Sequence, residues 1–336
     1  MSPLLSARAP GKVVLSGAYA VLAGAPALVT AVDRYAVASR AAPPSFRSDE
    51  VEVALAELKT EFLAAHPAAI ELPSAFFHPH IDAAELRRRV GAESEKLGIG
   101  SSAAIVVASL ALILAEQRGN PAPLGELRAR ALRAHRRAQG GGSGVDIDAA
   151  TFGGYRFFQR SGSLSHLEGR ALAPVGIDTE PRSYSTSLPE GLCFEAWAVA
   201  KPASTREFVA RVFGSQERDR STFDQLLTGQ CLASLEAERA VSQGSTEGLL
   251  EALAAQGQIL EKLGEFAGVP IFLPELLPLR SALGPGSAWL PAGAGGGDIM
   301  LYAGTSASPT LFRERAAALG LEELELSFGA RGVHFS

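Results

Sequence analysis

The stretch from Glu95 to Leu112 reads EKLGIGSSAAIVVASLAL, and it combines a lysine, a glycine-rich turn and a long run of small and aliphatic residues. The apolar run predicts a helix over residues 102–117 that is buried on most sides. Gly98 and Gly100 can adopt backbone angles that are closed to other residues, so a ligand could approach the main chain. The serine pair then lies at the helix N-terminus, where unpaired N–H groups and the helix dipole favour an anion. The stretch therefore predicts a phosphate-binding loop.

The residues around this loop add to that interpretation but do not settle it. Serine hydroxyls at such a position can ligate Mg²⁺, and Lys96 adds a positive charge just ahead of the loop. The stretch matches neither the dinucleotide-binding pattern nor the Walker pattern, which ends Gly-Lys-Ser/Thr. Taken alone, it is equally consistent with a serine-capped helix that follows a glycine turn.

Two further glycine-rich loops favour the ligand-binding interpretation. Residues 138–154 read AQGGGSGVDIDAATFGG and place Asp146 where a carboxylate could accept a proton from an attacking hydroxyl. Residues 291–300 read PAGAGGGDIM and form another tight turn. Ordering such loops costs conformational entropy, so three of them indicate a shared purpose, the close approach of backbone to a ligand. Asp148 and Asp298 are interpreted as structural.

Length and composition limit the classes of function. The chain has 336 residues, 47% of them hydrophobic and 20% charged, which suits two folded domains. A formal net charge of -5 argues against nucleic-acid binding but leaves room for a small anionic substrate held by a local lysine cluster. Cys193 and Cys231 cannot build a disulfide framework or a four-thiol zinc site. His78 and His80 are separated by a proline and are not interpreted as metal ligands.

The order of predicted elements favours an α+β protein, because helices and strands are mixed without regular βαβ alternation. A helix is expected near residues 18–23, a helix at 124–139 whose arginines form a solvated face, a strand at 193–200 and three helices within 205–268. Residues 49–66 fit either a helix or a strand followed by a helix. A polar, turn-rich segment at 161–190 predicts a domain boundary. Neither a signal peptide nor a membrane span is evident, so a cytoplasmic location without membrane contact is expected.

Three stretches together resemble the signature motifs of the GHMP kinases, the family of galactokinase, homoserine kinase, mevalonate kinase and phosphomevalonate kinase. They are APGKVVLSGAYAVLAG (9–24), KLGIGSSAA (96–104) and PAGAGGGD (291–298). They occur in the family's order, so the resemblance covers essentially the whole chain. It implies a two-domain α+β fold with a ribosomal protein S5 domain 2-like N-terminal domain and a ferredoxin-like C-terminal domain. The first would span residues 1–175 with the phosphate-binding loop, and the second 176–336 with a Gly-rich substrate-side loop.

Within the family, the chain is most similar to the phosphomevalonate kinase branch. AVDRYAVA (31–38), Lys96 and the Ala-Gln-Gly segment before Asp146 resemble that branch, and KPASTREFV (201–209) is similar to the family's Ala-Ser-Thr turn. The resemblance implies ATP-dependent phosphorylation of 5-phosphomevalonate to 5-diphosphomevalonate in the mevalonate route to isoprenoids, with Mg²⁺. The alternatives are a mevalonate kinase, another GHMP-type kinase or related decarboxylase, or a ligand sensor that no longer catalyses. A monomer or a homodimer would be compatible with each.

The resemblance also implies roles for individual residues. Lys12 would contact the acceptor or the transferred group, Lys96 would neutralise charge between two phosphates, and Asp146 would orient or deprotonate the acceptor. The nucleotide phosphates would be held by Gly98, Gly100, Ser101, Ser102 and Ala103, with a hydroxyl of Ser101 or Ser102 on Mg²⁺. The substrate side would be formed by Tyr19, Ser143, Gly144, Ser204, Thr205, Ala294, Gly295 and Gly296.

Each of these residues also has a plainer interpretation. Lys12 and Lys96 could be solvated charges, Asp146 could close a turn, and Ser204 with Thr205 could cap a helix. One position departs from the family, because Ala18 stands where its members usually carry a glutamate. If that acid supports a lysine or the metal, its replacement could change substrate choice or lower activity. Two lysines fit a phosphate acceptor better than an alcohol, because a phosphate is already ionised and needs screening more than a base.

Overall fold

The computed structural model describes residues 6–43, 47–67, 76–90, 93–139, 142–160, 181–199 and 205–336. The chain divides into two compact units, each assembled from separate segments. Unit 1 comprises Met1–Lys12, Ala31–Gly154 and Ser327–Ser336, and unit 2 comprises Val13–Thr30 and Tyr155–Leu326. The boundary expected at residues 175 and 176 lies outside the described residues and stays a prediction.

Unit 1 contains antiparallel strands, and the first part of β1 carries the start of the first motif, up to Lys12. Its strand order is β12–β1–β2, with β3 pairing β2, and the register sets Ala7 opposite Phe335 and Val37 opposite Asp82. A separate hairpin joins β4 to β5. The strands are β1 (Ser6–Ser16), β2 (Ala27–Ser39), β3 (His80–Asp82), β4 (Arg87–Val90), β5 (Glu93–Lys96) and β12 (His334–Phe335), with a short 3-10 helix, η3 (Ala84–Leu86). Both β1 and β2 also have residues in unit 2.

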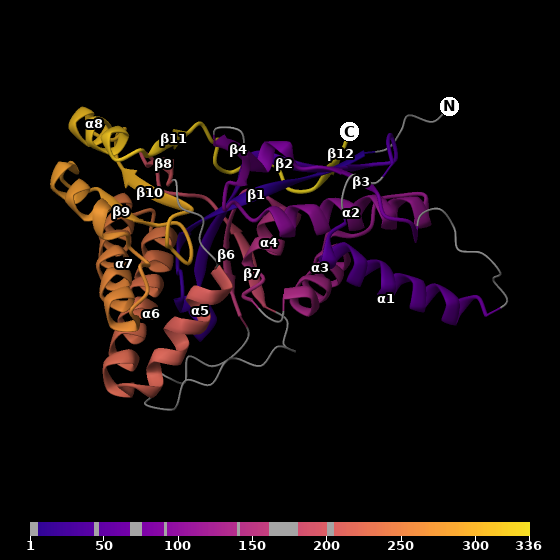
Figure 1. The fold of residues 1–336 in the computed structure, drawn as a ribbon, viewed down its shortest axis with the longest axis horizontal. Coiled ribbons are helices and arrows are strands. Elements are labelled where there is room, and N and C mark those ends of the chain that lie inside the picture. The colour runs from indigo at the N-terminus through magenta and orange to yellow at the C-terminus, as the bar shows by residue number, and fades with distance from the viewer. Residues whose placement is uncertain are drawn as a thin grey trace. The chain divides into compact units, whose positions relative to one another are not determined.

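Unit 1 also contains four helices. The phosphate loop precedes one of them, and the glycine-rich loop that leads to Asp146 precedes another. The four helices are α1 (Asp49–Ala65), α2 (Ser101–Arg118), α3 (Leu124–Gln139) and α4 (Val145–Phe152). The expected apolar helix is confirmed as α2, and every residue from Ala103 to Ala115 in it is buried. Figure 1 shows α1, α2, α3 and α4 gathered in this unit, and α2 contacts each of the other three. Residues 49–65, for which the sequence left two possibilities open, form one helix.

The apolar character of α2 reflects its place in a core. Among the described residues, α2 alone is long and apolar enough to cross a membrane, and 72% of that stretch is buried inside the structure. Core helices of globular proteins have this combination, because a helix that is hydrophobic all round must be covered on all sides.

Unit 2 contains the β6 and β7 strands of the six-stranded sheet β12–β1–β2–β6–β7, a second sheet and the longest helices. The first part of β2 pairs with β6 and β6 with β7, while a second antiparallel sheet has the order β11–β8–β10–β9. Its strands are β6 (Tyr155–Gln159), β7 (Arg182–Thr186), β8 (Cys193–Ala198), β9 (Ala288–Pro291), β10 (Ile299–Gly304) and β11 (Glu322–Leu324). Its helices are α5 (Thr205–Gly214), α6 (Arg220–Ser242), α7 (Thr246–Ala267) and α8 (Thr310–Ala318), with 3-10 helices η1 (Ala20–Ala23), η5 (Ser215–Glu217) and η6 (Pro274–Ala282).

Local sequence explains where the two longest helices of unit 2 begin and end. The side chains of Asp219 and Ser245 accept hydrogen bonds from the first turns of α6 and α7, and Gly268 ends α7 in the left-handed conformation. The two helices run side by side and contact each other extensively (Figure 1). The strand expected at 193–200 and the three helices expected within 205–268 are confirmed, and the mixture of helices and antiparallel sheets is the expected α+β class.

Candidate active site

The predicted phosphate loop has the geometry that close approach of an anion requires. Gly98 and Gly100 have φ angles of 75° and 77°, in the left-handed region that favours glycine. Gly100 immediately precedes α2, whose first turn has no side-chain cap. The N–H groups of this turn are therefore left for a ligand, at the positive end of an 18-residue helix. Ser101 and Ser102 are half-buried, and Ala103 is buried.

Lys12 of β1 lies directly against this loop. Its backbone N–H donates to the carbonyl of Ile99 at 2.8 Å. A Cβ atom on Gly100 would lie 3.2 Å from Cε and Cγ of Lys12 and 3.4 Å from Oδ2 of Asp146. Because Lys12 is only 8% exposed, it is not a solvated strand lysine. The ammonium group is held at the loop instead.

Asp146 meets Lys12 from the second glycine-rich loop. It lies in the first turn of α4, after Gly144, which has a φ of 87°. Its Oδ1 is 3.8 Å from Nζ of Lys12. The structure therefore brings a lysine, a carboxylate and an uncapped helix N-terminus together within unit 1. This arrangement can hold an anion and orient a polar acceptor beside it.

The neighbouring residues of the second loop have structural contacts. Asp148 is fully buried and pairs with Nε of Arg128 at 3.1 Å, as its structural interpretation requires. The hydroxyl of Ser143 accepts from the N–H of Val145 at 3.3 Å. The solvated face expected for the arginines of 124–139 is wrong for Arg128, whose side chain is 13% exposed because it neutralises this buried carboxylate.

Lys96 occupies the end of β5, opposite Arg87 in the hairpin. Its side chain is exposed. It lies three residues before Ile99, the residue whose carbonyl accepts from Lys12. Lys96 is therefore near the loop in the chain and accessible, and its catalytic role stays a prediction.

In unit 2, the third motif is held by the first. Tyr19 has a φ of 62° and is 3% exposed, and its hydroxyl donates to the carbonyl of Ala294 at 2.7 Å. Gly295 has a φ of 78°, and a Cβ there would lie 2.2 Å from the carbonyl oxygen of Ile271. The N–H of Gly296 donates to the same oxygen at 3.1 Å. The buried Tyr19 therefore fixes the glycine-rich turn, while its predicted contact with substrate is untested.

The turn of the first motif rests on two buried glutamines. Oε1 of Gln256 accepts from the N–H of Gly17 at 2.8 Å, and Nε2 of Gln230 donates to the carbonyl of Ala18 at 3.1 Å. Ala18 itself is 8% exposed within an apolar cluster that includes Phe223 and Leu227. A carboxylate here would be buried among aliphatic and aromatic side chains, so the surroundings are matched to alanine.

The last two substrate-side candidates lie at the start of α5. Thr205 is its first residue and is exposed, whereas Ser204 lies outside the described residues. Either role proposed for Thr205, capping or substrate contact, is compatible with this position.

Glu50 is a buried carboxylate that the sequence did not indicate. It lies in the first turn of α1, is 7% exposed, and accepts hydrogen bonds from Ser48 at 2.7 Å and Gln139 at 2.7 Å. Burial raises the pKa of its carboxyl, but hydrogen bonds, chiefly from Gln139 and Ser48, outweigh burial and lower it. A buried carboxylate thus joins the residue before α1 to the end of α3. No local motif marks it, because its partner on α3 lies 89 residues away.

The oxygen donors at the phosphate loop fit Mg²⁺. Two serine hydroxyls and the carboxylate of Asp146 are hard donors of the kind this ion prefers. Within the described residues, no group of three or more His, Cys, Asp or Glu side chains could hold a metal alone. An ion that is bound partly by these residues and partly by a nucleotide triphosphate suits this donor set.

The ring of His78 accepts from the N–H of Ser48 at 3.4 Å and contacts the carbonyl of Pro79 at 3.1 Å, so both its nitrogens have partners.

Comparison with known proteins agrees with this geometry. Residues 71–154, which carry the phosphate loop and Asp146, match the GHMP kinases N terminal domain. The chain is 29% identical over 258 residues to a phosphomevalonate kinase from Streptomyces sp. (strain CL190), covering 73% of this chain and 68% of the relative. It is also 29% identical over 269 residues to a mevalonate kinase from Archaeoglobus fulgidus, covering 77% and 79%.

A solved structure extends the likeness to almost the whole chain. Streptococcus pneumoniae phosphomevalonate kinase, in complex with phosphomevalonate and AMPPNP, superimposes with a TM-score of 0.70 at 22% identity, covering 96% of this chain and 99% of that one. The chain therefore has the two-domain α+β fold of the GHMP kinases, and its relatives support a phosphotransferase of this type.

Proposed function

We propose that this chain transfers the γ-phosphoryl group of ATP to the phosphate of 5-phosphomevalonate, giving 5-diphosphomevalonate. One observation carries the proposal: Lys12, Gly100 and Asp146 meet at the uncapped start of α2. Such a place stabilises an anion through bare N–H groups, a helix dipole and a buried ammonium group. The relatives that match over most of the chain are kinases whose names identify phosphomevalonate or mevalonate as substrate.

The loop residues are proposed to hold the nucleotide. The N–H groups that follow Gly98 and Gly100 would bind the β- and γ-phosphates, and Lys12 would contact the group in transfer. A hydroxyl of Ser101 or Ser102 would ligate Mg²⁺, which neutralises charge on the transferring phosphoryl group. Because phosphoryl transfer passes through a loose transition state, positioning and positive charge would account for most of the rate.

The acceptor is inferred from charge. Two like charges about 4 Å apart repel by about 4 kcal/mol at an effective dielectric of 20, so a phosphate acceptor needs cations near the γ-phosphate. Lys12 lies at the loop and the exposed Lys96 ends the strand before it. Asp146 pairs with Lys12 at 3.8 Å, and it is proposed to orient the acceptor or to accept its proton. Thr205 and the turn that Gly295 and Gly296 form are proposed for the acceptor side, with Gly295 itself packed against the backbone of Ile271.

Mevalonate is the second candidate acceptor. The Archaeoglobus relative is a mevalonate kinase and is as similar in sequence as the phosphomevalonate kinase. Transfer to the hydroxyl of mevalonate would depend on Asp146 as a base, whereas a phosphate acceptor is already ionised. We further infer a cytoplasmic enzyme that acts on small molecules, as a monomer or homodimer, without nucleic acid or membrane as partner.

A coupled assay for ADP tests the proposal. The purified chain is supplied with ATP, Mg²⁺ and, in turn, phosphomevalonate, mevalonate, diphosphomevalonate, galactose and homoserine. We expect ADP formation with phosphomevalonate, and a new diphosphate signal by ³¹P NMR. ADP formed with mevalonate alone would show that mevalonate is the acceptor instead of phosphomevalonate. Carbon dioxide released from diphosphomevalonate would identify a decarboxylase. Binding of ATP without ADP from any acceptor would contradict the enzyme and favour a sensor.

A further inference from the structure

The β4–β5 hairpin leads directly into the phosphate loop, and its two faces differ in charge. Side chains alternate between the two faces of a strand. Leu86 and Leu97 are buried at the base of the inner face, where the N–H of Leu97 donates to the carbonyl of Leu86 at 3.1 Å. The outer face carries four exposed side chains, those of Arg87, Arg89, Ser94 and Lys96. Three cations therefore share one small surface.

The cations of the outer face are not neutralised by a carboxylate. On the inner face, Arg88 pairs with Glu95 at 3.7 Å. Within the described part of the chain, the three outer-face cations form no ion pair. Arg87 also lies directly opposite Lys96 in the register of the hairpin. Like charges in such positions destabilise a strand pair, since their Cβ atoms are about 5 Å apart. A bound anion would offset this repulsion.

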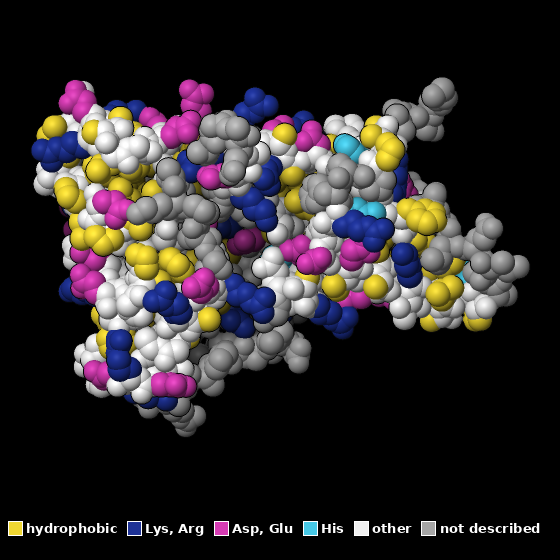
Figure 2. Space-filling view, in the orientation of Figure 1, with side chains coloured by type: hydrophobic (Ala, Val, Ile, Leu, Met, Phe, Trp, Pro, Cys, Tyr) yellow, Lys and Arg dark blue, Asp and Glu magenta, His cyan; other side chains and the backbone are white. Residues whose placement is uncertain are grey.

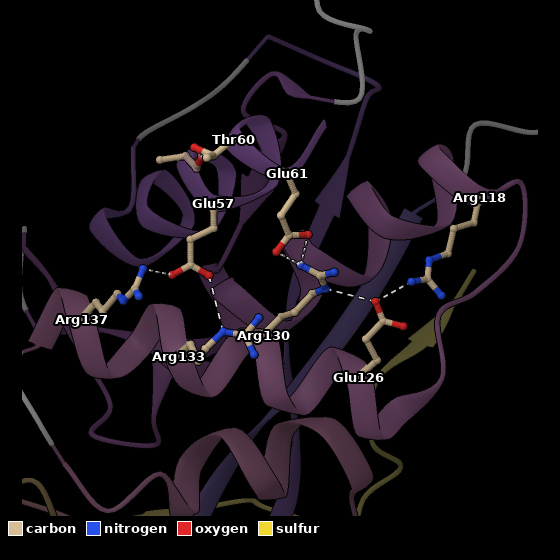
Figure 3. Close-up of polar contacts among 9 residues, drawn as sticks. Glu57, Thr60, Glu61, Arg118, Glu126, Arg130, Arg133 and Arg137 are labelled. Carbon is tan, nitrogen blue, oxygen red and sulfur yellow. Dashed lines mark hydrogen bonds and ion pairs between the residues drawn. The ribbon is translucent and has the colours of Figure 1, made fainter. Parts of the chain in front are cut away.

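The arginines of α3 differ, because acidic residues of α1 neutralise them. Glu57 pairs with Arg137 at 2.5 Å and with Arg133 at 3.7 Å (Figure 3). Glu61 pairs with Arg130 at 2.8 Å. Figure 2 shows basic and acidic side chains interspersed over the face that α1 and α3 present. An anion would have to compete with these carboxylates, whereas the outer face of the hairpin offers its charges without competition.

The guanidinium of Arg87 is held in place by neutral groups. Its Nε donates to Oγ of Ser94 at 2.9 Å, and a second N–H donates to the carbonyl of Ser94. A guanidinium has five N–H donors, so three of them remain for a ligand. Because neither partner is charged, the positive charge of Arg87 is retained. A fixed guanidinium with spare donors matches the oxygens of a phosphate group.

The outer face adjoins the loop that is proposed to hold the γ-phosphate. Two peptide links separate Lys96 from Gly98, so their Cα atoms are at most about 7.6 Å apart. The next residue, Ile99, accepts the backbone N–H of Lys12 at 2.8 Å. The buried leucines fix the base of the hairpin at this end. An anion on the outer face would therefore lie beside the phosphate loop.

We propose that the outer face of the β4–β5 hairpin binds the phosphate group of the acceptor, and that Arg87 and Arg89 thereby favour a phosphorylated acceptor over an alcohol. The two arginines hold the anionic group before transfer and take no part in bond breaking. The inference rests on the proposed function in one respect, because the bound anion is taken to be the acceptor.

The test compares Arg87→Gln, Arg89→Gln and the double variant with the wild type. Glutamine removes the charge and keeps a polar side chain at an exposed position, so Tm should change little. The matched control is Arg88→Gln, which makes the same charge change on the inner face of the same strand. Isothermal titration calorimetry gives Kd for phosphomevalonate and for mevalonate, and steady-state kinetics give KM for each acceptor and for ATP.

We expect each single variant to raise Kd and KM for phosphomevalonate about tenfold, as loss of a hydrogen bond to a charged group does, and the double variant to raise them further. Kd for mevalonate, KM for ATP and all constants of Arg88→Gln should stay near the wild-type values. Unchanged phosphomevalonate binding in the double variant would overturn the proposal. An equal loss in Arg88→Gln would show that only net charge matters, and an equal rise in KM for ATP would assign the arginines to the nucleotide; either result would contradict it.

Calorimetry separates this inference from the proposed function, because binding needs no turnover. Added salt should weaken phosphomevalonate binding more steeply in the wild type than in the double variant, which keeps one outer-face cation instead of three. Absence of ADP formation with every acceptor, together with these binding changes, would contradict only the proposed reaction. ADP formation from phosphomevalonate, with equal binding by the wild type and the double variant, would contradict only the role of the arginines.

Discussion

The phosphate loop of unit 1 and the glycine-rich loop of unit 2 are alike in sequence but differ in their surroundings. Both hold glycines at positive φ. Gly100 has a lysine and a carboxylate within 3.4 Å of its missing Cβ, and an uncapped helix follows it. Gly295 instead faces the carbonyl of Ile271, and Tyr19 fixes the residue before it. Glycines thus indicate close backbone approach. The charges beside Gly100 favour an anion as the approaching group, whereas Gly295 is approached by the backbone of its own unit.

The largest effect is expected when the positive charge beside the phosphate loop is removed. Lys12→Ala should lower kcat/KM about 10³-fold, because it removes the buried ammonium group that faces the loop. Tm should change little, since Asp146 is half-buried and can be hydrated. Steady-state kinetics and thermal unfolding check this, with Lys59→Ala on α1 as the control. A variant with normal kcat/KM would show that Lys12 does not act on the ligand.

Lys96→Ala tests whether an exposed charge contributes as much as a buried one. We expect kcat to fall about 100-fold while KM for ATP changes less, because Lys96 is proposed to screen two phosphates as they meet rather than to bind the nucleotide. The measurement is kcat and KM for both substrates. Turnover like that of the wild type would remove Lys96 from the catalytic set.

Equivalent alanine substitutions sharpen the contrast between the loops. Gly295→Ala should lower the free energy of unfolding by about 3 kcal/mol, because its methyl group would lie 2.2 Å from a backbone oxygen at a φ of 78°. Gly100→Ala should lower it by about 1 kcal/mol, because its methyl group meets the flexible side chain of Lys12 at 3.2 Å.

The two variants should show the opposite order in activity. Gly100→Ala displaces Lys12, so kcat/KM should fall more than tenfold in a protein that remains folded. Gly295→Ala should lose activity chiefly in proportion to the fraction unfolded. Urea unfolding and kinetics on the same preparations measure both quantities. Equal stability losses would contradict the distinction between a ligand loop and a packed loop.

Tyr19→Phe tests how the packed loop is fixed. Removing the hydroxyl leaves the carbonyl of Ala294 without the 2.7 Å hydrogen bond, which should lower the free energy of unfolding by about 1 kcal/mol. KM for ATP should not change. Urea unfolding gives the first quantity and kinetics the second. A larger change in KM than in stability would assign Tyr19 to ligand binding after all.

The smallest expected effect concerns pH. The pKa of Glu50 is lowered in the folded chain, so its contribution to stability is present above its ordinary value of 4.5 and is lost as pH falls through the lowered value. The stability difference between wild type and Glu50→Gln should therefore be full at pH 7 and shrink below about pH 4.5. Urea midpoints across this range measure it. A difference that grows on acidification would contradict an ionised Glu50.

Local patterns predicted the elements that their own residues determine. The apolar helix α2 was expected at 102–117 and spans Ser101–Arg118, because its sequence is hydrophobic on every face. Helix α1 could not be settled from sequence, since its ion pairs with α3 join residues 69 and 80 positions apart. The meeting of Lys12, the loop and Asp146 was implied only by the family resemblance.

The supporting polar residues could not have been predicted. Gln256 lies 240 residues from Ser16, its partner at the first motif, and Gln230 lies 212 residues from Ala18. Nothing local distinguishes these glutamines from others on α6 and α7. The same holds for Glu50, which reads as one acidic residue among several in the first turn of α1. The sequence also made Ala18 look like a defect, whereas the apolar cluster around it shows a position built for a small side chain.

A crystal structure of the chain with Mg²⁺ and AMPPNP tests the central claim most directly. We predict that the β- and γ-phosphates accept hydrogen bonds from the N–H groups at the start of α2, with Nζ of Lys12 within about 3 Å of a γ-phosphate oxygen. A triphosphate bound elsewhere, with Lys12 still paired to Asp146 and the first turn of α2 facing solvent, would contradict the account.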